Sequence, residues 1–218
     1  MKVSKSFPEP EVNKIYKLLY NYYGTQNWWP ADSEFEVIVG AVLTQNTSWR
    51  NVEKVITNLK KKKLLHAKRL EQLSVSELGK LIRSSGFYRV KSRRLKAMVD
   101  FLIHRYSGRI DNLKKQALSI LRLELLNIYG IGEETADSIL LYALDKPVFV
   151  VDAYTKRIFS RHGYFNPDEP YTTIQEFFSR NLPKSVKIYN EYHALLVRLA
   201  KDYCQKKPLC STCPINGM

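Results

Sequence analysis

The sequence predicts an all-α protein, and three observations support this fold class. Apolar residues recur at three- and four-residue spacing along most of the 218-residue chain, which is the period of an amphipathic helix. Gly, Pro, Ser and Asp interrupt these periodic segments at positions suited to helix ends. The one β-like run, residues 148–151, is too short and too isolated to found a sheet, so we interpret it as a buried connector.

The first expected helices lie in the N-terminal third of the chain. Residues 11–23 carry an apolar stripe on one helical face. Ser33 is suited to cap the next helix, whose residues up to Leu43 are apolar on nearly all sides, as expected of a buried helix. A further helix begins at Trp49 and runs into four lysines, residues 60–63, which suit the negative end of the helix dipole.

The middle of the chain continues the helical pattern. Ser74 and Glu77 have the spacing of a capping box, and Gly86 closes the short helix that they open. Residues 91–106 alternate basic and apolar side chains, which predicts one basic face and one core face. The remaining expected helices, in chain order, are 118–126, 133–144, 152–161, near 173–181 and 184–203.

The charge of the chain favours a polyanionic partner. The sequence contains 35 Lys and Arg against 21 Asp and Glu, a formal net charge of +14. A folded basic chain points first to nucleic acid and second to an anionic membrane surface, with a lysine-rich compositional bias as the alternative. No apolar run reaches the ~18 residues that span a bilayer, and residues 1–5 lack the apolar run of a signal peptide, so we expect a cytoplasmic protein.

A glycine-rich turn joins the helices expected at 118–126 and 133–144. Gly130, Ile131 and Gly132 would let the backbone approach a phosphate closely, and the amides that open the next helix, near Thr135, would favour an anion. Such a turn holds DNA without reading its sequence. An ordinary helical hairpin without a ligand is the alternative.

The hairpin belongs to a longer pattern, Leu126-x-x-Tyr129-Gly-Ile-Gly-x-x-Thr135, followed by Val150-Val151-Asp152. With Leu43-Thr-Gln-Asn-Thr47 and the terminal cysteines, it resembles the helix-hairpin-helix DNA glycosylases of the endonuclease III superfamily over nearly the whole chain. The resemblance implies a monomeric base excision repair enzyme that binds double-stranded DNA carrying a damaged base in a cleft between two helical lobes. The expected lobes are a six-helix barrel, 33–146, with the hairpin motif at about 118–144, and a second lobe built from 1–32 plus 147–218.

The same resemblance assigns the catalytic role to Asp152. A carboxylate at the start of a helix can stabilise the positive charge that develops on the sugar and can orient the attacking water. Asp152 is also suited to be a plain N-cap, and one aspartate can do both. Bifunctional members carry a lysine in the hairpin that forms a Schiff base, whereas Glu134 occupies that position here. We therefore expect a monofunctional enzyme without lyase activity.

Aromatic residues suggest the substrate. Trp28-Trp29-Pro30 and Trp49 look like the base pocket of the helix-hairpin-helix 3-methyladenine DNA glycosylases of the type described in Helicobacter. A cationic alkylated purine is attracted to an aromatic face. Packing of these tryptophans within a lobe is the alternative. Two other functions stay open: an endonuclease III-like glycosylase for oxidised or mismatched pyrimidines, and a non-catalytic DNA-binding module. The sequence contains no amphipathic basic helix strong enough to favour a protein that binds a membrane surface.

Other polar residues are candidates for DNA contacts. The resemblance implies that Gln45 fills the gap left by the flipped nucleotide, although Gln45 could instead cap the preceding helix. Arg50, Lys91, Arg93 and Arg94 are candidates for phosphate contacts, with solvated charge as the alternative.

Three cysteines end the chain with the spacing C-x5-C-x2-C: Cys204, Cys210 and Cys213. Clustered cysteines in a reducing compartment suggest a metal site. The resemblance implies a four-cysteine [4Fe-4S] cluster, but its fourth cysteine would fall at position 219, one beyond Met218. Truncation, a different fourth ligand and loss of the cluster are the three explanations, and we favour a bound or vestigial cluster with a structural role.

Overall fold

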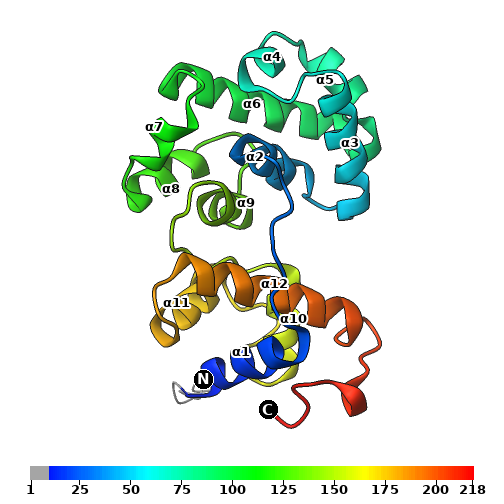
Figure 1. The fold of residues 1–218 in the computed structure, drawn as a ribbon, viewed down its shortest axis with the longest axis vertical. Coiled ribbons are helices and arrows are strands. Elements are labelled where there is room, and N and C mark those ends of the chain that lie inside the picture. The colour runs from blue at the N-terminus through cyan, green and yellow to red at the C-terminus, as the bar shows by residue number, and fades with distance from the viewer. Residues whose placement is uncertain (1–9) are drawn as a thin grey trace. The chain divides into compact units, whose positions relative to one another are not determined.

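The computed structural model describes residues 10–218, and within them it contains α-, 3₁₀- and π-helices but no strand. The predicted all-α fold class is confirmed. The α-helices are α1 (Pro10–Tyr23), α2 (Glu34–Leu43), α3 (Trp49–Lys61), α4 (Ala67–Glu71), α5 (Val75–Leu81), α6 (Tyr88–Tyr106), α7 (Ile110–Lys114), α8 (Leu118–Leu126), α9 (Glu133–Ser138), α10 (Ala153–Arg161), α11 (Tyr171–Asn181) and α12 (Val186–Asp202) (Figure 1). A π-helical stretch, η2 (Ile139–Ala143), extends α9, and two 3₁₀ turns, η1 (Arg83–Ser85) and η3 (Cys210–Thr212), complete the helical elements.

The chain divides into two units, each of which has its own core. The central unit is Ala31–Lys146, and the terminal unit joins the chain up to Pro30 with Pro147–Met218. The first boundary expected from the sequence, between residues 32 and 33, lies two residues after the division between Pro30 and Ala31.

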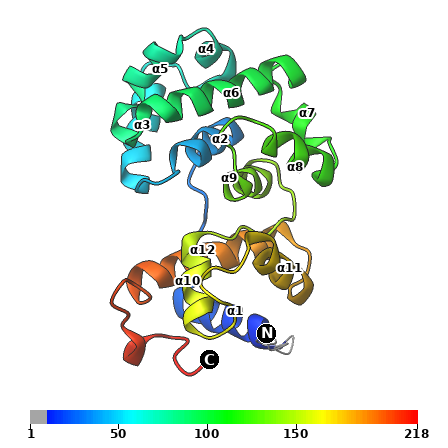
Figure 2. The same ribbon diagram turned by 180° about the vertical axis from the view of Figure 1, so that it is seen from behind.

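The buried helix α2 is the centre of the central unit. It packs against α3, α6, α9 and η2, and both views show it between α6 and α9 (Figure 1, Figure 2). Residues from Phe35 to Leu43 are buried without interruption. The Ser33 side chain accepts a hydrogen bond from Glu36 N, which confirms the predicted cap. A largely apolar helix therefore lies inside the unit, and the amphipathic helices surround it.

A buried lysine ends this central helix. Lys91, in α6, is 1% exposed, and its ammonium group donates to Leu43 O at 2.9 Å and to Ser85 O at 2.7 Å. The Leu43 carbonyl belongs to the last turn of α2, where carbonyls lack partners within the helix. Burial, together with the charge of Arg94, lowers the pKa of Lys91 to about 8. Lys91 is thus a structural residue, and the prediction that it contacts a phosphate is wrong.

The terminal unit buries the β-like connector together with much of α12. α12 packs against α1 and α10. Phe149 stacks on Phe178 with ring centroids 4.0 Å apart, and its carbonyl accepts a hydrogen bond from Gln175 at 2.7 Å. Val151 N donates to the hydroxyl of Tyr171 at 3.3 Å. Side chains therefore take the hydrogen bonds that a neighbouring strand would otherwise provide.

Helix starts follow the predicted signals, whereas Gly86 closes the turn η1 and not α5, whose C-cap is Ile82, and short elements were missed. The capping box of Ser74 and Glu77 is present in full. Asp152 caps α10, as predicted. The five-residue helices α4 and α7 and the turns η1 and η3 were not predicted, because so short a segment shows no helical period.

No helix among residues 10–218 is both long enough and apolar enough to cross a bilayer. This finding confirms the absence of a membrane span in the described part of the chain. The sequence argument against a signal peptide rests on residues 1–5, which lie outside the described residues.

Lys91→Met is expected to lower the free energy of unfolding by about 1–3 kcal/mol, because two buried carbonyls lose their donor. The difference in free energy of unfolding between the native chain and the variant should grow between pH 8 and pH 10. In that range the unfolded lysine binds a proton that the folded one has released, so native stability rises with pH. Urea denaturation followed by circular dichroism measures both effects.

Lys61→Met, at an exposed lysine that ends α3, is the matched control and should change stability by less than about 0.5 kcal/mol. Equal stability of the two variants would contradict the capping role of Lys91.

Candidate active site

Asp152 lies where the buried connector of the terminal unit meets α10. Its side chain is 12% exposed. Oδ1 accepts hydrogen bonds from Thr155 N at 2.7 Å and from Thr155 Oγ1 at 2.9 Å. The N-cap interpretation is therefore confirmed, and the cap leaves the second carboxylate oxygen available for another interaction.

A histidine from α12 lies against that second oxygen. His193 Nε2 is 3.5 Å from Asp152 Oδ2, and the histidine side chain is 7% exposed. Burial by itself raises the pKa of Asp152, but the charge of His193, its hydrogen bond and the two Thr155 donors lower it, and the net pKa is below the usual value. The structure thus holds an ionised carboxylate inside the unit. Sequence reasoning missed His193, because a single histidine in an apolar helix carries no signal of its distant partner.

A fixed, buried carboxylate of this kind can do two things chemically. It can stabilise a positive charge that develops next to it, because low local polarity strengthens the attraction. It can also accept a hydrogen bond from a water molecule and so orient that water for attack. Both actions require the ionised form, which the His193 and Thr155 contacts favour.

The predicted hairpin is present in the central unit, and its two glycines have different environments. Gly130 has φ +76°, and a Cβ added there would lie 2.4 Å from Cγ of Arg94. Gly132 is the N-cap of α9, and a Cβ added there would meet no atom within 4 Å. Gly130 is therefore required for packing and backbone conformation, whereas Gly132 leaves open space in front of the helix start.

An ion pair joins the two helices of the hairpin. Arg122, in α8, donates from Nε to Asp137 Oδ1 at 2.7 Å and from Nη2 to Asp137 Oδ2 at 3.0 Å. Asp137, in α9, is fully buried. A bidentate arginine fixes the angle of its partner as well as the distance, so the pair holds the geometry of the turn between α8 and α9.

Gln45 is bound to the same hairpin. Its Nε2 donates to Gly130 O at 3.0 Å and to Thr135 Oγ1 at 2.9 Å, and its Oε1 accepts from Arg94. Thr44, and not Gln45, ends α2. In this conformation Gln45 ties the loop after α2 to the turn, so its role as a gap-filling residue stays a prediction that requires these bonds to be released.

The other basic candidates differ in accessibility. Arg50 and Arg93 are exposed, as a phosphate contact requires, and they remain predictions. Arg94 is partly buried against Gly130 and Gln45. These surroundings give Arg94 a structural task in the turn.

The tryptophans of the expected base pocket belong to both units. Trp28 and Trp29 lie in the terminal unit, half-buried, with ring centroids 5.7 Å apart at 65°, and Pro30 is exposed. The ammonium group of Lys201 lies 5.9 Å from the centroid of Trp28. Trp49 opens α3 in the central unit. The pocket stays a prediction for all four residues.

Glu134 lies in the first turn of α9 and is exposed. It is the residue that the resemblance places at the lysine position, and the structure puts it two residues after Gly132 in the turn. A carboxylate at this position has no nucleophilic nitrogen to offer.

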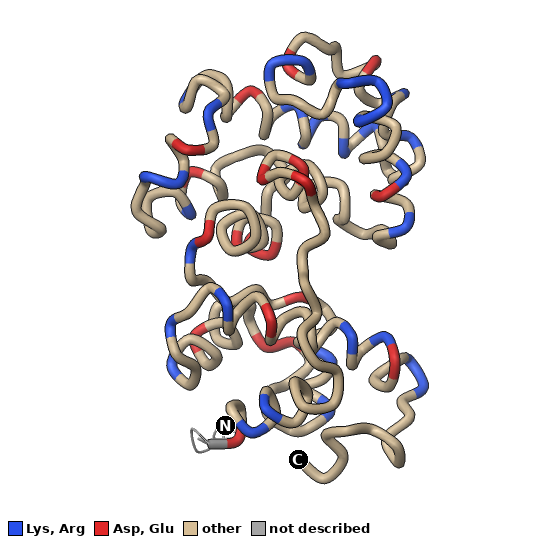
Figure 3. Tube along the Cα trace, viewed as in Figure 1, with Lys and Arg blue, Asp and Glu red and all other residues tan. Residues whose placement is uncertain are grey.

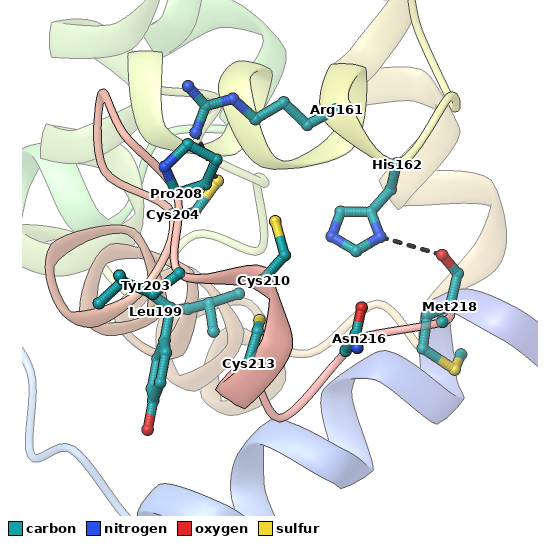
Figure 4. A pocket seen from close by; sticks show the side chains of 12 residues that line it. Arg161, His162, Leu199, Tyr203, Cys204, Pro208, Cys210, Cys213, Asn216 and Met218 are labelled. Carbon is teal, nitrogen blue, oxygen red and sulfur yellow. Dashed lines mark hydrogen bonds between the residues drawn. The ribbon is translucent and has the colours of Figure 1, made fainter.

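The three cysteines line one cavity of about 310 Å³ in the terminal unit (Figure 4). Burial is the main cause that raises the pKa of Cys213. No three Cys, His, Asp or Glu side chains among residues 10–218 converge on a position for one metal ion. In a [4Fe-4S] cluster each protein ligand binds a different iron, so the ligands surround a volume, and the thiol-lined cavity fits that chemistry.

Comparisons with known proteins place these features in a family. The model of the HhH-GPD superfamily of base excision DNA repair proteins matches residues 39–184. The chain is 54% identical over 207 residues to the "Putative DNA repair glycosylase" of Methanocaldococcus jannaschii, covering 94% of each chain. It is 30% identical over 185 residues to endonuclease III of Thermotoga maritima, covering 82% of this chain and 79% of that one.

Solved structures agree with the fold. The Helicobacter pylori 3-methyladenine DNA glycosylase bound to 1,N6-ethenoadenine matches with a TM-score of 0.76 and 29% identity, covering 89% of this chain and 98% of that one. A non-covalent endonuclease III–DNA complex matches with a TM-score of 0.81 and 22% identity, covering 95% and 93%. At that identity, the second likeness concerns the fold alone.

Alanine at each of the two hairpin glycines is expected to affect stability differently, because Gly130 is tightly packed and Gly132 faces open space. Gly130→Ala should lower the free energy of unfolding by about 1–3 kcal/mol, because the new Cβ meets the Arg94 stem and the backbone has positive φ. Gly132→Ala, the matched control in the same turn, should change stability by no more than about 1 kcal/mol. Thermal and urea unfolding measure the difference. A destabilisation of equal size at both positions would contradict the distinct environments.

Proposed function

Because this chain belongs to the HhH-GPD superfamily of base excision DNA repair proteins, it is a DNA glycosylase, and we propose that it hydrolyses the N-glycosidic bond of alkylated purines of the 3-methyladenine type in duplex DNA. We further propose that the enzyme is monofunctional and leaves an abasic site. The observation that carries the proposal is the ionised Asp152, buried and held by Thr155 and His193.

The proposed reaction uses Asp152 for charge stabilisation. The enzyme extrudes the damaged nucleotide from the helix. As the N-glycosidic bond lengthens, positive charge builds on the sugar, and the Asp152 carboxylate stabilises that charge and orients the attacking water. Water supplies the hydroxyl group of the abasic sugar and releases its second proton, which the Asp152 carboxylate can accept, and the purine leaves with the bonding electron pair. An alkylated purine is already cationic, so it leaves as a neutral base with little need for an acid.

The hairpin supports a hydrolytic rather than a lyase mechanism. Strand cleavage by the bifunctional enzymes requires an amine that attacks the sugar and forms a Schiff base. Glu134 stands at that position in the first turn of α9. Its carboxylate cannot form the Schiff base, which favours attack by water.

Two observations support the alkylated purine as substrate. The similarity to the Helicobacter pylori 3-methyladenine DNA glycosylase, at 29% identity over most of both chains, is the first. The second is the half-buried pair Trp28 and Trp29, because a cation over an aromatic face gains about 0.5–2 kcal/mol. An endonuclease III-like substrate is the second candidate, since the Thermotoga enzyme of that name is 30% identical over 185 residues.

The charge of the chain suits its DNA ligand. The net charge of +14 provides the sequence-independent attraction to phosphates that a scanning enzyme requires. Figure 3 shows Lys and Arg along α3 and α6, while Asp and Glu occur on α2 and α9. We propose that Gly132 and the start of α9 approach a phosphate, and that exposed Arg50 and Arg93 add further phosphate contacts.

The cysteine cavity has a structural place in this proposal. Cys204, Cys210 and Cys213 would hold a [4Fe-4S] cluster, which when bound would join the segment after α12 to the rest of the terminal unit. The cavity is lined by Arg161 at the end of α10, by its C-cap His162 and by residues after 198, and Asp152 is not among them.

Asp152→Asn is expected to slow base release by at least about 100-fold while duplex binding stays within a few-fold of the native affinity. The assay uses duplexes that each carry one lesion: 1,N6-ethenoadenine, an alkylated purine, an oxidised pyrimidine or a G·T mismatch. Each is incubated with the enzyme and then treated with or without alkali. The native enzyme should give strand breaks only after alkali and only at the modified purines.

Three outcomes would contradict parts of the proposal. Full activity of Asp152→Asn would remove the catalytic role. Excision confined to the pyrimidine or mismatch substrates would favour the endonuclease III-like candidate. Covalent trapping of the protein on lesion DNA by borohydride would show a Schiff base and exclude a monofunctional enzyme.

Replacement of His193 is expected to raise the pKa of Asp152 and so move the acidic limb of the activity profile to higher pH. The sign follows because activity requires the ionised carboxylate, and His193 lowers the pKa of Asp152. His193→Phe should therefore lose more activity at pH 5 than at pH 8, and His193→Gln, which keeps a donor, should lose less. Single-turnover base release against pH measures the limb. His104→Gln, at an exposed histidine in α6, is the control, and an unmoved limb in His193→Phe would contradict the role.

A further inference from the structure

Half of the net charge of the chain is concentrated in one short segment. Residues 50–69 contain eight Lys and Arg and one Glu, a net charge of +7, whereas the whole chain carries +14. The segment comprises nearly all of α3, the turn that follows it and the first residues of α4, and Figure 3 shows Lys and Arg along α3. The positive charge is therefore a local feature of the central unit and not a uniform property of the chain.

Three basic residues of α3 form a line on its exposed face. Arg50, Lys54 and Lys61 are exposed, and their spacing of four and then seven residues places them on one side of a helix. The buried residues of the opposite side are Val52, Val55, Ile56 and Leu59. Arg50, Lys54 and Lys61 thus form a basic ridge along the solvent side of α3.

The other charged residues of α3 lie beside this ridge, and one of them is neutralised. Lys60 Nζ is 2.8 Å from Asp32 Oδ2 and 2.8 Å from Glu36 Oε2. Glu53 comes seven residues before Lys60, and so it lies on the same flank of the helix.

The lysines of the ridge keep their charge uncompensated. Neither Lys54 nor Lys61 makes an ion pair with another residue of the described range 10–218. The ridge therefore presents its positive charge to solvent, where an anionic partner can reach it.

Helix stability explains only one end of the ridge. Lys61 lies in the last turn of α3, where a cation suits the negative end of the helix dipole. Arg50 lies in the first turn, at the positive end, and this turn contains no Asp or Glu. Because the dipole favours anions at that end, an anionic ligand explains the position of Arg50 better than helix stability does.

The ridge begins close to the hairpin and has the length of a short stretch of duplex. Gln45 donates to Gly130 O, and α3 begins four residues after Gln45, at Trp49. Lys61 follows Arg50 by eleven residues, which corresponds to about 16 Å along the helix axis. One DNA strand carries a phosphate per about 3.4 Å of duplex axis, so the ridge has the length of about five base pairs.

We propose that the basic ridge of Arg50, Lys54 and Lys61 binds the phosphate backbone of duplex DNA on one side of the damaged nucleotide. Arg50 is the contact nearest in sequence to the loop that holds the hairpin, and Lys54 and Lys61 extend the binding surface along the flanking duplex. Phosphate contacts do not depend on base sequence or on damage. The inference rests on the proposed function for its ligand and for the role of Arg50, but it does not depend on the alkylated purine.

The first test measures the affinity of the 218-residue chain for undamaged duplex as a function of salt, by fluorescence anisotropy. Lys54→Gln/Lys61→Gln should bind at least about tenfold more weakly at about 50 mM salt. The slope of log affinity against log salt should become shallower by about two, one for each phosphate contact removed. Lys54→Arg/Lys61→Arg keeps both charges and should bind as the native chain does.

Lys14→Gln/Lys17→Gln is the matched control, because it removes two exposed lysines from one helix, α1, in the terminal unit. It should leave the affinity and the salt slope nearly unchanged.

The second test locates the contact relative to the lesion. A duplex with a stable abasic-site analogue fixes the register, whichever base the enzyme removes. Shortening one flank by about five base pairs should abolish the difference between the native chain and Lys54→Gln/Lys61→Gln, and shortening the other flank should preserve it. At saturating enzyme the variant should release a damaged base within about twofold of the native single-turnover rate, since the ridge holds only the flanking duplex.

Four results would overturn the proposal: an unchanged salt slope, an equal loss of affinity in the ridge and α1 variants, a difference that survives shortening of either flank, or a loss of binding to phosphatidylserine vesicles while duplex binding is unchanged. The last result would indicate a membrane surface as the partner. Failure of the native chain to release any of the tested bases would contradict the proposed function and leave the binding comparison decisive for the ridge.

Discussion

The negative charge of Asp152 is kept inside the terminal unit by donors from two helices. Thr155 provides two hydrogen bonds from the first turn of α10, and His193 approaches from α12. An unpaired buried carboxylate would take up a proton, and the start of α10 would lose its cap. The same contacts therefore fix a helix start, hold α10 against α12 and keep the carboxylate in the ionised form on which the proposed reaction depends.

The pair also explains why the connector before Asp152 is not helical. A residue that caps a helix has an extended backbone, and the residues before it carry the chain through an aromatic core. Phe149 stacks on Phe178, while Gln175 and Tyr171 bond to the connector backbone. Asp152 follows a connector in which two backbone groups, Phe149 O and Val151 N, have side chains as hydrogen-bond partners, and this helps the chain to stay buried up to the aspartate.

Much of the fold was predictable from local signals. The largely apolar pattern of α2, the capping box at Ser74 and the N-cap at Asp152 each depend on residues a few positions apart. Long-range pairs were not predictable. In the sequence, Lys91 looks like one of the basic surface residues of its helix. Only the fold shows that it donates a hydrogen bond to the end of α2. His193 could not be matched to Asp152 for the same reason, since spacing within one helix says nothing about a contact between two helices.

The close contact between Gly130 and Arg94 has a consequence for the evolution of the hairpin. The arginine stem occupies the space that any side chain at position 130 would fill, and the same arginine donates to Gln45. A relative that acquires a larger residue at position 130 must therefore shorten or redirect the side chain at position 94, and thereby release the loop after α2. The three positions are therefore expected to change together.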